Sequence, residues 1–442
     1  MPEFKMARGS KRAPARALAA LSLALLGSLL FAAPAASAAA PPVWPPSARG
    51  WTGFIKPAWF GANTSGLDSD ATLALVARHA VAGYAWEQGH GPGRQRVGRE
   101  EALLAAAATR ARDFLDRANA STVLFVYRQV QVCCRMFGWC NYANVAPEAA
   151  GFWLADPVSG DRCLAEQPWR TADALWDFRQ PNATEWWLDN IVAELTSESA
   201  LTSAASGAAG AVFLDEVDQG TCGYRGSTCN FSAFDAPSLA AQQAASNDML
   251  ARTAAALNAA NIVPIFSLDN RLAASGEGLP GAPAPCALPE DELVAALNGT
   301  RWCRFYENWP ASFWVQENAD LHAAVIANAL LEVAAGVPVV IHGDGGCPAE
   351  NRTIARPGPL GGPVLFMVAS YLLVADGGTT LSLSRDYFSA SFCWRPELDV
   401  DFGAPLGTAT RLSSHSWARN FTRANVFIDV SQGFQASVEL LA

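Results

Sequence analysis

The chain has 442 residues, of which 51% are hydrophobic and 16% are charged, a composition that excludes a disordered protein and can form one large domain or two ordinary ones. The formal net charge is −10, and because residues 1–38 hold five basic side chains and one acidic one, the rest of the chain carries −14. This acidic surface argues against nucleic acid or an anionic membrane as the partner and favours a neutral or basic ligand.

Residues 1–38 have the pattern of a secretory signal. Five basic residues precede an apolar stretch rich in Leu and Ala from Ala17 to about Ala33, and the small residues Ala36-Ser37-Ala38 follow as a cleavage site. We predict a signal peptide over residues 1–38, with an uncleaved membrane anchor as the alternative. After cleavage, the chain is expected outside the cell or in the lumen of the secretory pathway, without membrane attachment.

Ten cysteines and seven N-glycosylation sequons lie downstream of this signal. Both features indicate an oxidising compartment, so we predict a secreted glycoprotein with disulfide bonds. The cysteines have no metal-binding spacing and the five histidines are scattered, so no metal and no cofactor are expected. The pairing stays open: Cys222 and Cys229 are one candidate pair, and the adjacent Cys133 and Cys134 are expected to have different partners. The sequons begin at Asn63, Asn119, Asn182, Asn230, Asn298, Asn351 and Asn420.

A Pro-rich connector over residues 39–50 leads into short apolar runs that alternate with helical stretches. The predicted strands are Ala58–Gly61, Ala80–Trp86, Thr122–Tyr127, Ala211–Asp215, Ile262–Leu268, Arg304–Glu307, Pro338–His342 and Thr379–Ser384. The predicted helices are Arg99–Asn119, Thr184–Ser197, Leu239–Asn261, Asn318–Ala335 and Gly362–Ala375. This alternation predicts an α/β fold, a single (β/α)8 TIM barrel domain over residues 51–442. A doubly wound open sheet is the alternative, which the lack of a Gly-rich phosphate loop disfavours.

Two segments fall outside the barrel pattern. Gln131–Gln180, between the third strand and the next helix, is longer than an ordinary connection and holds four cysteines. Its part Phe152–Asp161 predicts a hairpin around Pro-Val-Ser-Gly, so we expect a disulfide-pinned insertion that folds over the barrel mouth. Trp417–Leu441 alternates apolar and polar residues around a Gln-Gly turn, which predicts a short C-terminal β-hairpin.

Acidic residues follow three of the predicted strands. The fourth strand ends at Asp215 and is followed by Glu216 and Asp218, while Asp269 follows the fifth strand and Glu307 ends the sixth. Because the carboxyl ends of parallel strands meet at the mouth of a barrel, these side chains are expected there. The alternative for each is an ordinary solvated loop, which suits Asp215 least because it directly follows Val-Phe-Leu.

Two carboxyl groups at one mouth suit glycoside hydrolysis. One protonates the leaving oxygen, and the other acts as a nucleophile or activates water. We predict Asp215 and Glu307 as the catalytic pair, because strands four and six lie close enough across a barrel mouth. A structural ion pair is the alternative, of Glu307 with Arg304 or of Asp269 with Arg271.

Aromatic residues accompany these acids. Flat apolar rings beside hydrogen-bonding groups suit pyranose sugars, although most aromatic residues of a barrel belong to its core. His342 is the only histidine at a predicted strand end. It could serve there as a hydrogen-bonded polar cap or as a hydrogen-bond partner of the substrate, and the sequence leaves both roles open. A Ser/His/Asp hydrolase is not supported, because the sequence has no G-x-S-x-G elbow. The predicted substrate-binding residues are Glu216, Asp218, Asp269, Trp86, Tyr127, Trp309 and His342. Further aromatic residues near strands are Trp59, Phe60, Tyr84 and Tyr306.

Several short stretches in order along most of the chain carry a family resemblance. They are Phe152–Asp161, Leu175–Asn182, Glu185–Val192, Val212–Asp218, Tyr371–Gly378, Gly403–Gly407 and Trp417–Phe421. Together they resemble glycoside hydrolases with a TIM barrel that are related to endo-α-1,4-polygalactosaminidases. The resemblance implies that the fourth-strand acid, here Asp215, is catalytic and that a partner acid from a later strand best matches Glu307. The chain differs in its additional cysteines and in Glu216, where relatives often carry Asn or another residue, so the acid and base roles stay open.

The sequence therefore predicts a secreted glycoside hydrolase that cleaves O-glycosidic bonds in an oligo- or polysaccharide by a two-carboxylate mechanism. Its expected partner is the carbohydrate substrate, and we expect a monomer. Two alternatives remain: a carbohydrate-binding barrel without turnover, and a secreted structural glycoprotein in which the acids form only ion pairs.

Overall fold

The structure is a computed structural model. The predicted signal and connector lie outside the residues that it describes. It describes residues 53–54, 56–61, 66–84, 100–133, 151–167, 170–197, 201–202, 210–215, 217, 228–267, 290–307, 309, 319–343, 363–383 and 394–441. None of the helices in these ranges has both the length and the apolar character that crossing a membrane requires.

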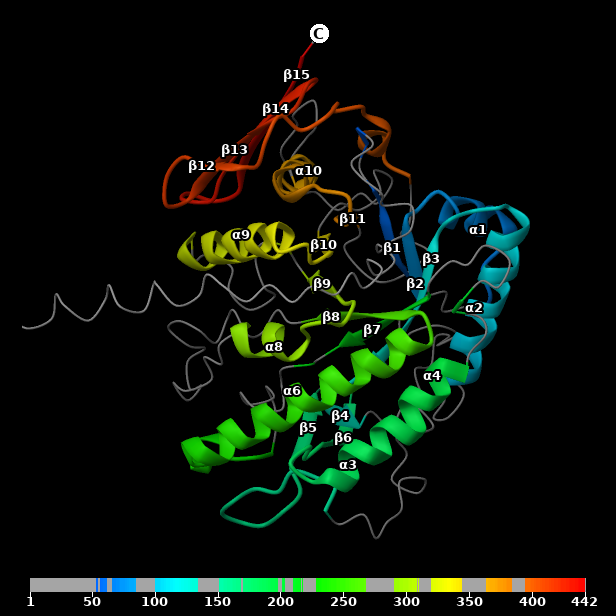
Figure 1. Cartoon of the computed structure of the whole chain (residues 1–442), viewed down its shortest axis with the longest axis vertical. Coiled ribbons are helices and arrows are strands. Elements are labelled where there is room, and N and C mark those ends of the chain that lie inside the picture. Colours follow the sequence, from blue (N-terminus) through cyan, green and yellow to red (C-terminus); the bar gives the residue numbers. More distant parts are fainter. Residues whose placement is uncertain are drawn as a thin grey trace, which may run out of the picture. The chain divides into compact units, whose positions relative to one another are not determined.

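Eight parallel strands form the central sheet, in the order β1-β2-β3-β7-β8-β9-β10-β11 (Figure 1). The strands are β1 (Ala58–Gly61), β2 (Val81–Tyr84), β3 (Val123–Gln129), β7 (Gly210–Asp215), β8 (Ile262–Ser267), β9 (Cys303–Tyr306), β10 (Val339–Gly343) and β11 (Thr380–Leu383). The first and last strands also meet, because Pro57 bridges Leu381 in parallel and the Leu381 N–H donates to the carbonyl of Lys56 at 2.9 Å. The sheet is therefore closed, and the predicted TIM barrel is confirmed with all eight strands.

The barrel strands are continuous apolar runs because the lumen covers one face and the helices cover the other. All seven residues of β3 and all six of β8 are buried. β7 is buried from Gly210 to Leu214 and ends at the half-buried Asp215. This first polar side chain at the end of an apolar strand marks the point where β7 reaches the barrel mouth.

Helices flank the strands, as Figure 1 shows for α2, α6 and α9. The helices are α1 (Asp70–Val76), α2 (Glu100–Arg117), α3 (Pro181–Trp186), the π-helix η4 (Trp187–Val192), α4 (Ala193–Ser197), α6 (Ala236–Ala259), α8 (Glu290–Ala296), α9 (Ala319–Ala334) and α10 (Pro363–Val374), with 3-10 turns η5 (Phe231–Ala233) and η7 (Pro396–Asp399). All five predicted helices are confirmed, and Thr184–Ser197 proves to be a run of α3, η4 and α4. The sequence pattern missed α1 and α8, because seven residues complete too few turns to show a clear helical period.

The predicted insertion lies between β3 and α3 and contains a small antiparallel sheet. Its strands are β4 (Val132–Cys133), β5 (Leu164–Gln167) and β6 (Arg170–Leu175), in the order β4-β6-β5. The predicted hairpin before them is confirmed by a bridge between Ala155 and Arg162. Asp156 closes its turn, because its Oδ1 accepts the N–H groups of Val158 and Ser159, each at 2.9 Å.

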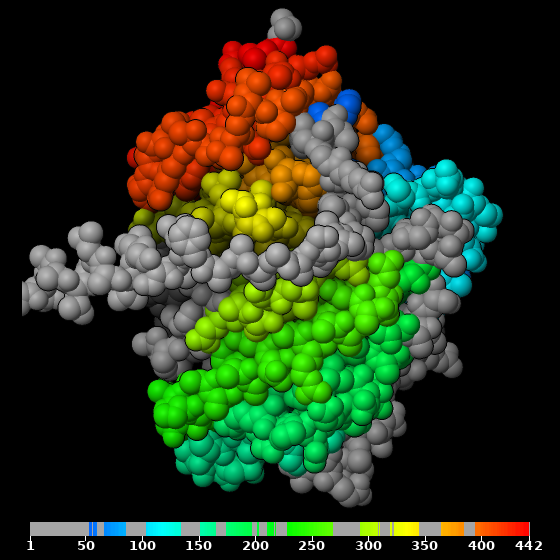
Figure 2. Space-filling model, viewed as in Figure 1, coloured from blue at the N-terminus to red at the C-terminus, as the bar shows by residue number. Residues whose placement is uncertain are grey.

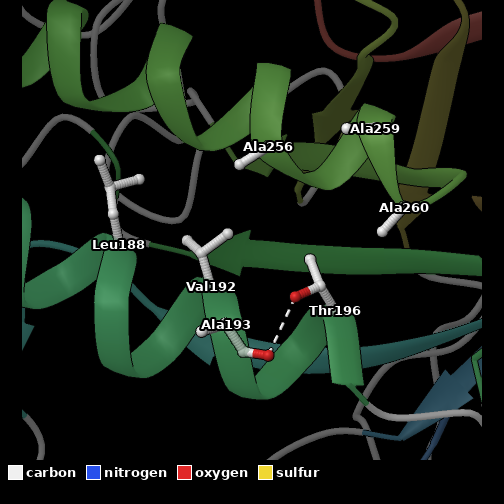
Figure 3. A pocket seen from close by; sticks show the side chains of 7 residues that line it. All are labelled: Leu188, Val192, Ala193, Thr196, Ala256, Ala259 and Ala260. Atoms are coloured by element: carbon white, nitrogen blue, oxygen red, sulfur yellow. Dashed lines mark hydrogen bonds between the residues drawn. The ribbon is translucent and has the colours of Figure 1, made fainter.

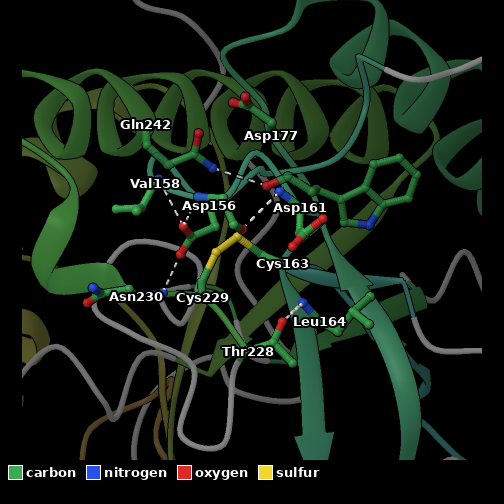
Figure 4. Close-up of a disulfide and its surroundings, with 12 residues drawn as sticks. Asp156, Val158, Asp161, Cys163, Leu164, Asp177, Thr228, Cys229, Asn230 and Gln242 are labelled. Atoms are coloured by element: carbon green, nitrogen blue, oxygen red, sulfur yellow. Dashed lines mark hydrogen bonds between the residues drawn. A yellow bond between two sulfur atoms is a disulfide. The ribbon is translucent and has the colours of Figure 1, made fainter.

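A disulfide joins this insertion to the segment that follows β7 (Figure 4). Cys229 pairs with Cys163, so the candidate pair of Cys229 with Cys222 is wrong. Backbone bonds hold the two segments together, because the Thr228 N–H donates to the carbonyl of Leu164 at 2.9 Å. Cys133 is also disulfide-bonded.

The C-terminal hairpin is part of a four-stranded antiparallel sheet. Its strands are β12 (Thr410–Arg411), β13 (Ser416–Asn420), β14 (Ala424–Asp429) and β15 (Gln435–Leu440). The predicted turn is confirmed between β14 and β15, where Gly433 has a φ of +87° that favours glycine. β13, β14 and β15 contact α10, and Phe434 packs against His322 of α9 with ring centroids 4.8 Å apart. Figure 2 shows the orange and red atoms of this sheet against the yellow atoms of α9.

Two of the stretches that carry the family resemblance meet at the amino-terminal end of the barrel. Arg419 of β13 donates from Nη1 to the carbonyls of Leu372, Leu373 and Ala375, at 3.0, 2.9 and 2.7 Å. A helix leaves its last carbonyls without partners inside the helix, and Arg419 supplies them for α10. This contact fixes the C-terminal sheet to the barrel.

Candidate active site at the barrel mouth

Asp215 and Tyr127 form a hydrogen-bonded pair at the carboxyl ends of two neighbouring strands. The Tyr127 hydroxyl donates to Oδ2 of Asp215 at 2.6 Å, and the Tyr127 side chain is 4% exposed. Tyr127 is in register with Phe213, two residues before Asp215, so strand alternation places all three side chains on one face of the sheet. The ring contacts of Phe213 with Phe125 of β3 and Phe305 of β9 identify this face as the barrel lumen.

The lumen changes from apolar to polar at its carboxyl end. The apolar layer consists of Phe213, Ile265, Phe305 and Val340 together with the ring of Tyr127. The last inward positions of β3, β7, β8, β10 and β11 instead hold Gln129, Asp215, Ser267, His342 and Ser382, as the registers of the strand pairs show. A polar layer above an apolar one is the arrangement expected of a binding site at the top of a barrel.

Glu307 directly follows β9 and is half-buried. It lies one position beyond the end of β9 and two positions beyond the inward-facing Phe305. Arg304, the neighbour considered as its ion-pair partner, belongs to the opposite face of β9. There its guanidinium lies 3.7 Å from Glu332 of α9, which also accepts the Tyr306 hydroxyl at 2.7 Å. The described partners of Arg304 thus hold a helix against the outside of the barrel.

His342 is enclosed in the lumen, with 1% of its surface exposed. Its ring stacks on Phe305, with centroids 5.6 Å apart. Burial lowers the pKa of His342 to about 3, so the imidazole is neutral at physiological pH. A neutral imidazole has one donor and one acceptor and can hydrogen-bond at the mouth without adding charge.

Several aromatic residues near the strand ends lie on the outer face of the sheet. Trp59 and Tyr84 pack edge-to-face, with ring centroids 5.5 Å apart, and each is 1% exposed. Trp309 is 5% exposed and packs edge-to-face on Tyr306 at 5.2 Å, within the apolar cluster that includes α10. These rings stabilise contacts between strands and helices, which is the core role that most barrel aromatics have.

The structure brings together some of the predicted site residues and does not describe others. Asp215 and Tyr127 are in contact, His342 faces the lumen from β10, and Glu307 directly follows β9, the neighbouring strand. Four predicted residues, Trp86, Glu216, Asp218 and Asp269, lie outside the described ranges. Within those ranges, no group of three or more His, Cys, Asp or Glu side chains is arranged to hold a metal ion.

The sequence analysis missed three residues of the polar layer: Gln129, Ser267 and Ser382. Each is the last inward residue of its strand, and each is at most 5% exposed. Counting back in steps of two from the end of the predicted strand Thr379–Ser384 finds Ser382. Gln129 lies beyond the end of the predicted strand Thr122–Tyr127, and Ser267 is one position before the predicted strand end Leu268, so the same count misses both. They were overlooked because neutral polar side chains at strand ends attract less attention than acids do.

An apolar groove on the helical layer is separate from the mouth (Figure 3). It lies between η4 with α4 and the end of α6, which lead into the amino-terminal ends of β7 and β8. Its lining residues are Leu188, Val192, Ala193, Thr196, Ala256, Ala259 and Ala260. The one polar side chain among them, Thr196, donates its hydroxyl to the carbonyl of Ala193 at 2.9 Å. The groove therefore has no group suited to acid/base chemistry.

No family model and no curated protein sequence matches the chain. Solved structures similar to it include an α-galactosidase from Thermus thermophilus (14% identity, 83% of this chain and 65% of that one, TM-score 0.43). Another is a dextranase from Flavobacterium johnsoniae (9% identity, 90% of this chain and 50% of that one, TM-score 0.45). A third is an exo-β-N-acetylglucosaminidase from Vibrio harveyi (9% identity, 66% of this chain and 41% of that one, TM-score 0.35). The chain spans 41–65% of the length of these three proteins. At these identities and TM-scores, the likeness says nothing about the residues of the mouth.

Proposed function

We propose that this protein is a secreted glycoside hydrolase that cleaves O-glycosidic bonds in an oligo- or polysaccharide, with Asp215 and Glu307 as its two catalytic carboxyl groups. The observation that carries the proposal is Asp215, which ends a buried strand at the barrel mouth and accepts the Tyr127 hydroxyl at 2.6 Å. The family resemblance of the sequence supports the same acid.

The bond from Tyr127 suggests separate roles for the two acids. The Tyr127 hydroxyl holds Oδ2 of Asp215 in one position, as a nucleophile or a base that activates water requires, so we assign this role to Asp215. Glu307 then donates a proton to the glycosidic oxygen as the bond between carbon and oxygen breaks. Water supplies a hydroxyl to the sugar and returns a proton to the carboxyl pair, which restores both acids.

The other predicted residues complete this proposal. Trp86 is the aromatic platform for a sugar ring, and Glu216, Asp218, Asp269 and His342 bind its hydroxyl groups. Trp309, which packs in the core, contributes by supporting the strand end that carries Glu307.

In this proposal, the enzyme acts after the signal peptide has directed it into the secretory pathway. The signal covers residues 1–38, the connector residues 39–50, and the single catalytic domain residues 51–442, which acts as a monomer outside the cell or in the secretory lumen. The bond between Cys163 and Cys229 supports an oxidising compartment. N-glycosylation is supported by the exposure of all five sequon asparagines within the described ranges: Asn119, Asn182, Asn230, Asn298 and Asn420.

The proposal is tested by measuring reducing ends released from a panel of neutral and amino-sugar polysaccharides. Wild type is expected to release sugars from at least one of them, and Asp215→Asn and Glu307→Gln are expected to lose this activity. Asp189→Asn, which changes an exposed acid on η4, is the matched control and should behave as wild type. Binding without release by wild type would instead identify a carbohydrate-binding barrel, and neither binding nor release a structural glycoprotein.

A further inference from the structure

The start of the insertion holds the segment that carries Asp215. The N–H of Val130 donates to the carbonyl of Asp215 at 3.0 Å, which continues the pairing of β3 with β7 by one residue. The next residue, Gln131, donates from Nε2 to the carbonyl of Val217 at 3.0 Å. Two successive residues after β3 thus hold the backbone carbonyls of Asp215 and Val217.

Gln131 is itself held by two further elements. Its Nε2 also donates to the Ser246 hydroxyl of α6 at 3.2 Å, and its backbone carbonyl accepts the N–H of Trp176 at 3.1 Å. Gln131 and Val217 are 0% exposed, and Ser246 is 1% exposed. A hydrogen bond enclosed in this way does not exchange readily with water, so it defines one backbone position.

The same insertion holds the chain again where the described part resumes after β7. There the disulfide between Cys163 and Cys229 and the bond from Thr228 to Leu164 fix residues 228 and 229 (Figure 4). The N–H of Asn230 adds a bond to Oδ2 of Asp156 at 2.6 Å. The insertion is therefore a support for the connection that leaves β7, with Gln131 as its contact nearest to Asp215.

We propose that Gln131 is a positioning residue for Asp215. Resting on the proposed function, this inference says that the carboxamide of Gln131 acts through the backbone of Val217 and does not touch the substrate. A displacement of about 1 Å in a catalytic group can lower turnover by about 100-fold, so one buried contact two residues away can control the rate.

Gln242 offers a matched control. It is 2% exposed, lies on α6, and donates from Nε2 to the carbonyl of Trp176 at 3.2 Å. In both glutamines, Oε1 has no hydrogen-bond partner within the described ranges. The two side chains therefore match in burial and in donating Nε2 to a backbone carbonyl, although Gln131 also bonds to Ser246. They differ in which carbonyl they hold: Gln131 holds the segment after β7, whereas Gln242 holds the end of the insertion.

The kinetic test compares Gln131→Met with Gln242→Met on a saccharide that wild type hydrolyses. Gln131→Met is expected to lower kcat about 10- to 100-fold while KM stays within about 3-fold. Gln242→Met should keep kcat within about 2-fold of wild type, even if both variants lose similar stability. Ser246→Ala, which removes the other partner of Gln131, is a milder variant with an expected fall in kcat of about 2- to 5-fold. Equal kcat values for the two methionine variants would overturn the proposal.

A second measurement does not depend on turnover. Amide hydrogen exchange should be faster in Gln131→Met than in wild type and Gln242→Met for peptides that cover Val130 and β7. Unchanged exchange there would refute the positioning role. If wild type hydrolyses no saccharide, the proposed function fails, and the exchange result still decides whether Gln131 holds this segment.

Discussion

The two ends of the barrel contain polar side chains that serve different purposes. At the amino-terminal end, the polar groups are bonded to the fold itself: Arg419 caps α10, Lys56 Nζ donates to the carbonyl of Gly377 at 2.8 Å, and Asp376 accepts the N–H groups of Gly378 and Thr379 at 2.7 and 2.9 Å. At the mouth, the acids Asp215 and Glu307 are half-buried, and the hydroxyl of Ser382 has no partner in the described part of the chain. On the proposed function, this difference separates polar groups that stabilise the fold at one end from polar groups that carry out chemistry at the other, as is usual in TIM barrels.

The largest expected effects come from one substitution at each end of the barrel, because one should affect activity and the other stability. Asp215→Asn should lower kcat/KM by about 1,000-fold or more and leave the free energy of unfolding within about 1 kcal/mol of wild type, because it removes a reacting group and keeps the shape. Arg419→Met should do the reverse: three carbonyls lose a charged donor, so stability falls by about 2–4 kcal/mol while kcat/KM at low temperature is unchanged. Sugar-release kinetics and denaturant unfolding measure both. Parallel losses in either variant would contradict the division.

A smaller effect is expected for the contact between Tyr127 and Asp215. Tyr127→Phe removes one hydrogen bond to a charged group, worth about 1.5–3 kcal/mol, so kcat/KM should fall about 10- to 100-fold. Sugar-release kinetics measure this fall. A kcat/KM equal to that of wild type would mean that the Tyr127 hydroxyl does not support this carboxylate in the reaction.

A further prediction concerns stability and pH, independently of turnover. Burial lowers the pKa of His342 to about 3 and that of His79 to about 4, whereas an unfolded chain binds these protons near pH 6.5. The contribution of each neutral histidine is therefore fully present above pH 6.5 and is lost as pH falls, toward about 4 for His79 and toward about 3 for His342, at about 1.4 kcal/mol per pH unit for each. Denaturant unfolding between pH 7.5 and 4.5 measures this slope. His342→Gln and His79→Gln should each flatten it, and a slope unchanged by both would contradict this origin.

The sequence allowed the barrel strands and Asp215 to be predicted because the relevant signals are local. A strand buried on both faces is a continuous apolar run, and an acid that directly follows Val-Phe-Leu must lie at its end. The pairing of β14 with β15 was predicted for the same reason, since its turn and alternation lie within Trp417–Leu441.

The contacts that decide function and stability could not be predicted, because they join residues far apart in the chain. Gln131 meets Val217 across 86 residues, and Arg419 meets Leu372 across 47. The disulfide between Cys163 and Cys229 spans 66 residues, whereas the candidate pair chosen from spacing was a short loop. The outward direction of Trp59 and Trp309 likewise depends on neighbouring strands and helices, which residue type does not reveal.

The most direct test of the central claim is chemical rescue of Asp215→Ala by azide, with sugar release and product identity measured together. If the ionised Asp215 is the nucleophile or base, a small anion in the space left by the carboxylate should restore part of the lost turnover and yield a glycosyl azide. If Asp215→Ala hydrolyses the substrate at the wild-type rate without azide, this carboxylate has no part in the reaction, which would contradict the account.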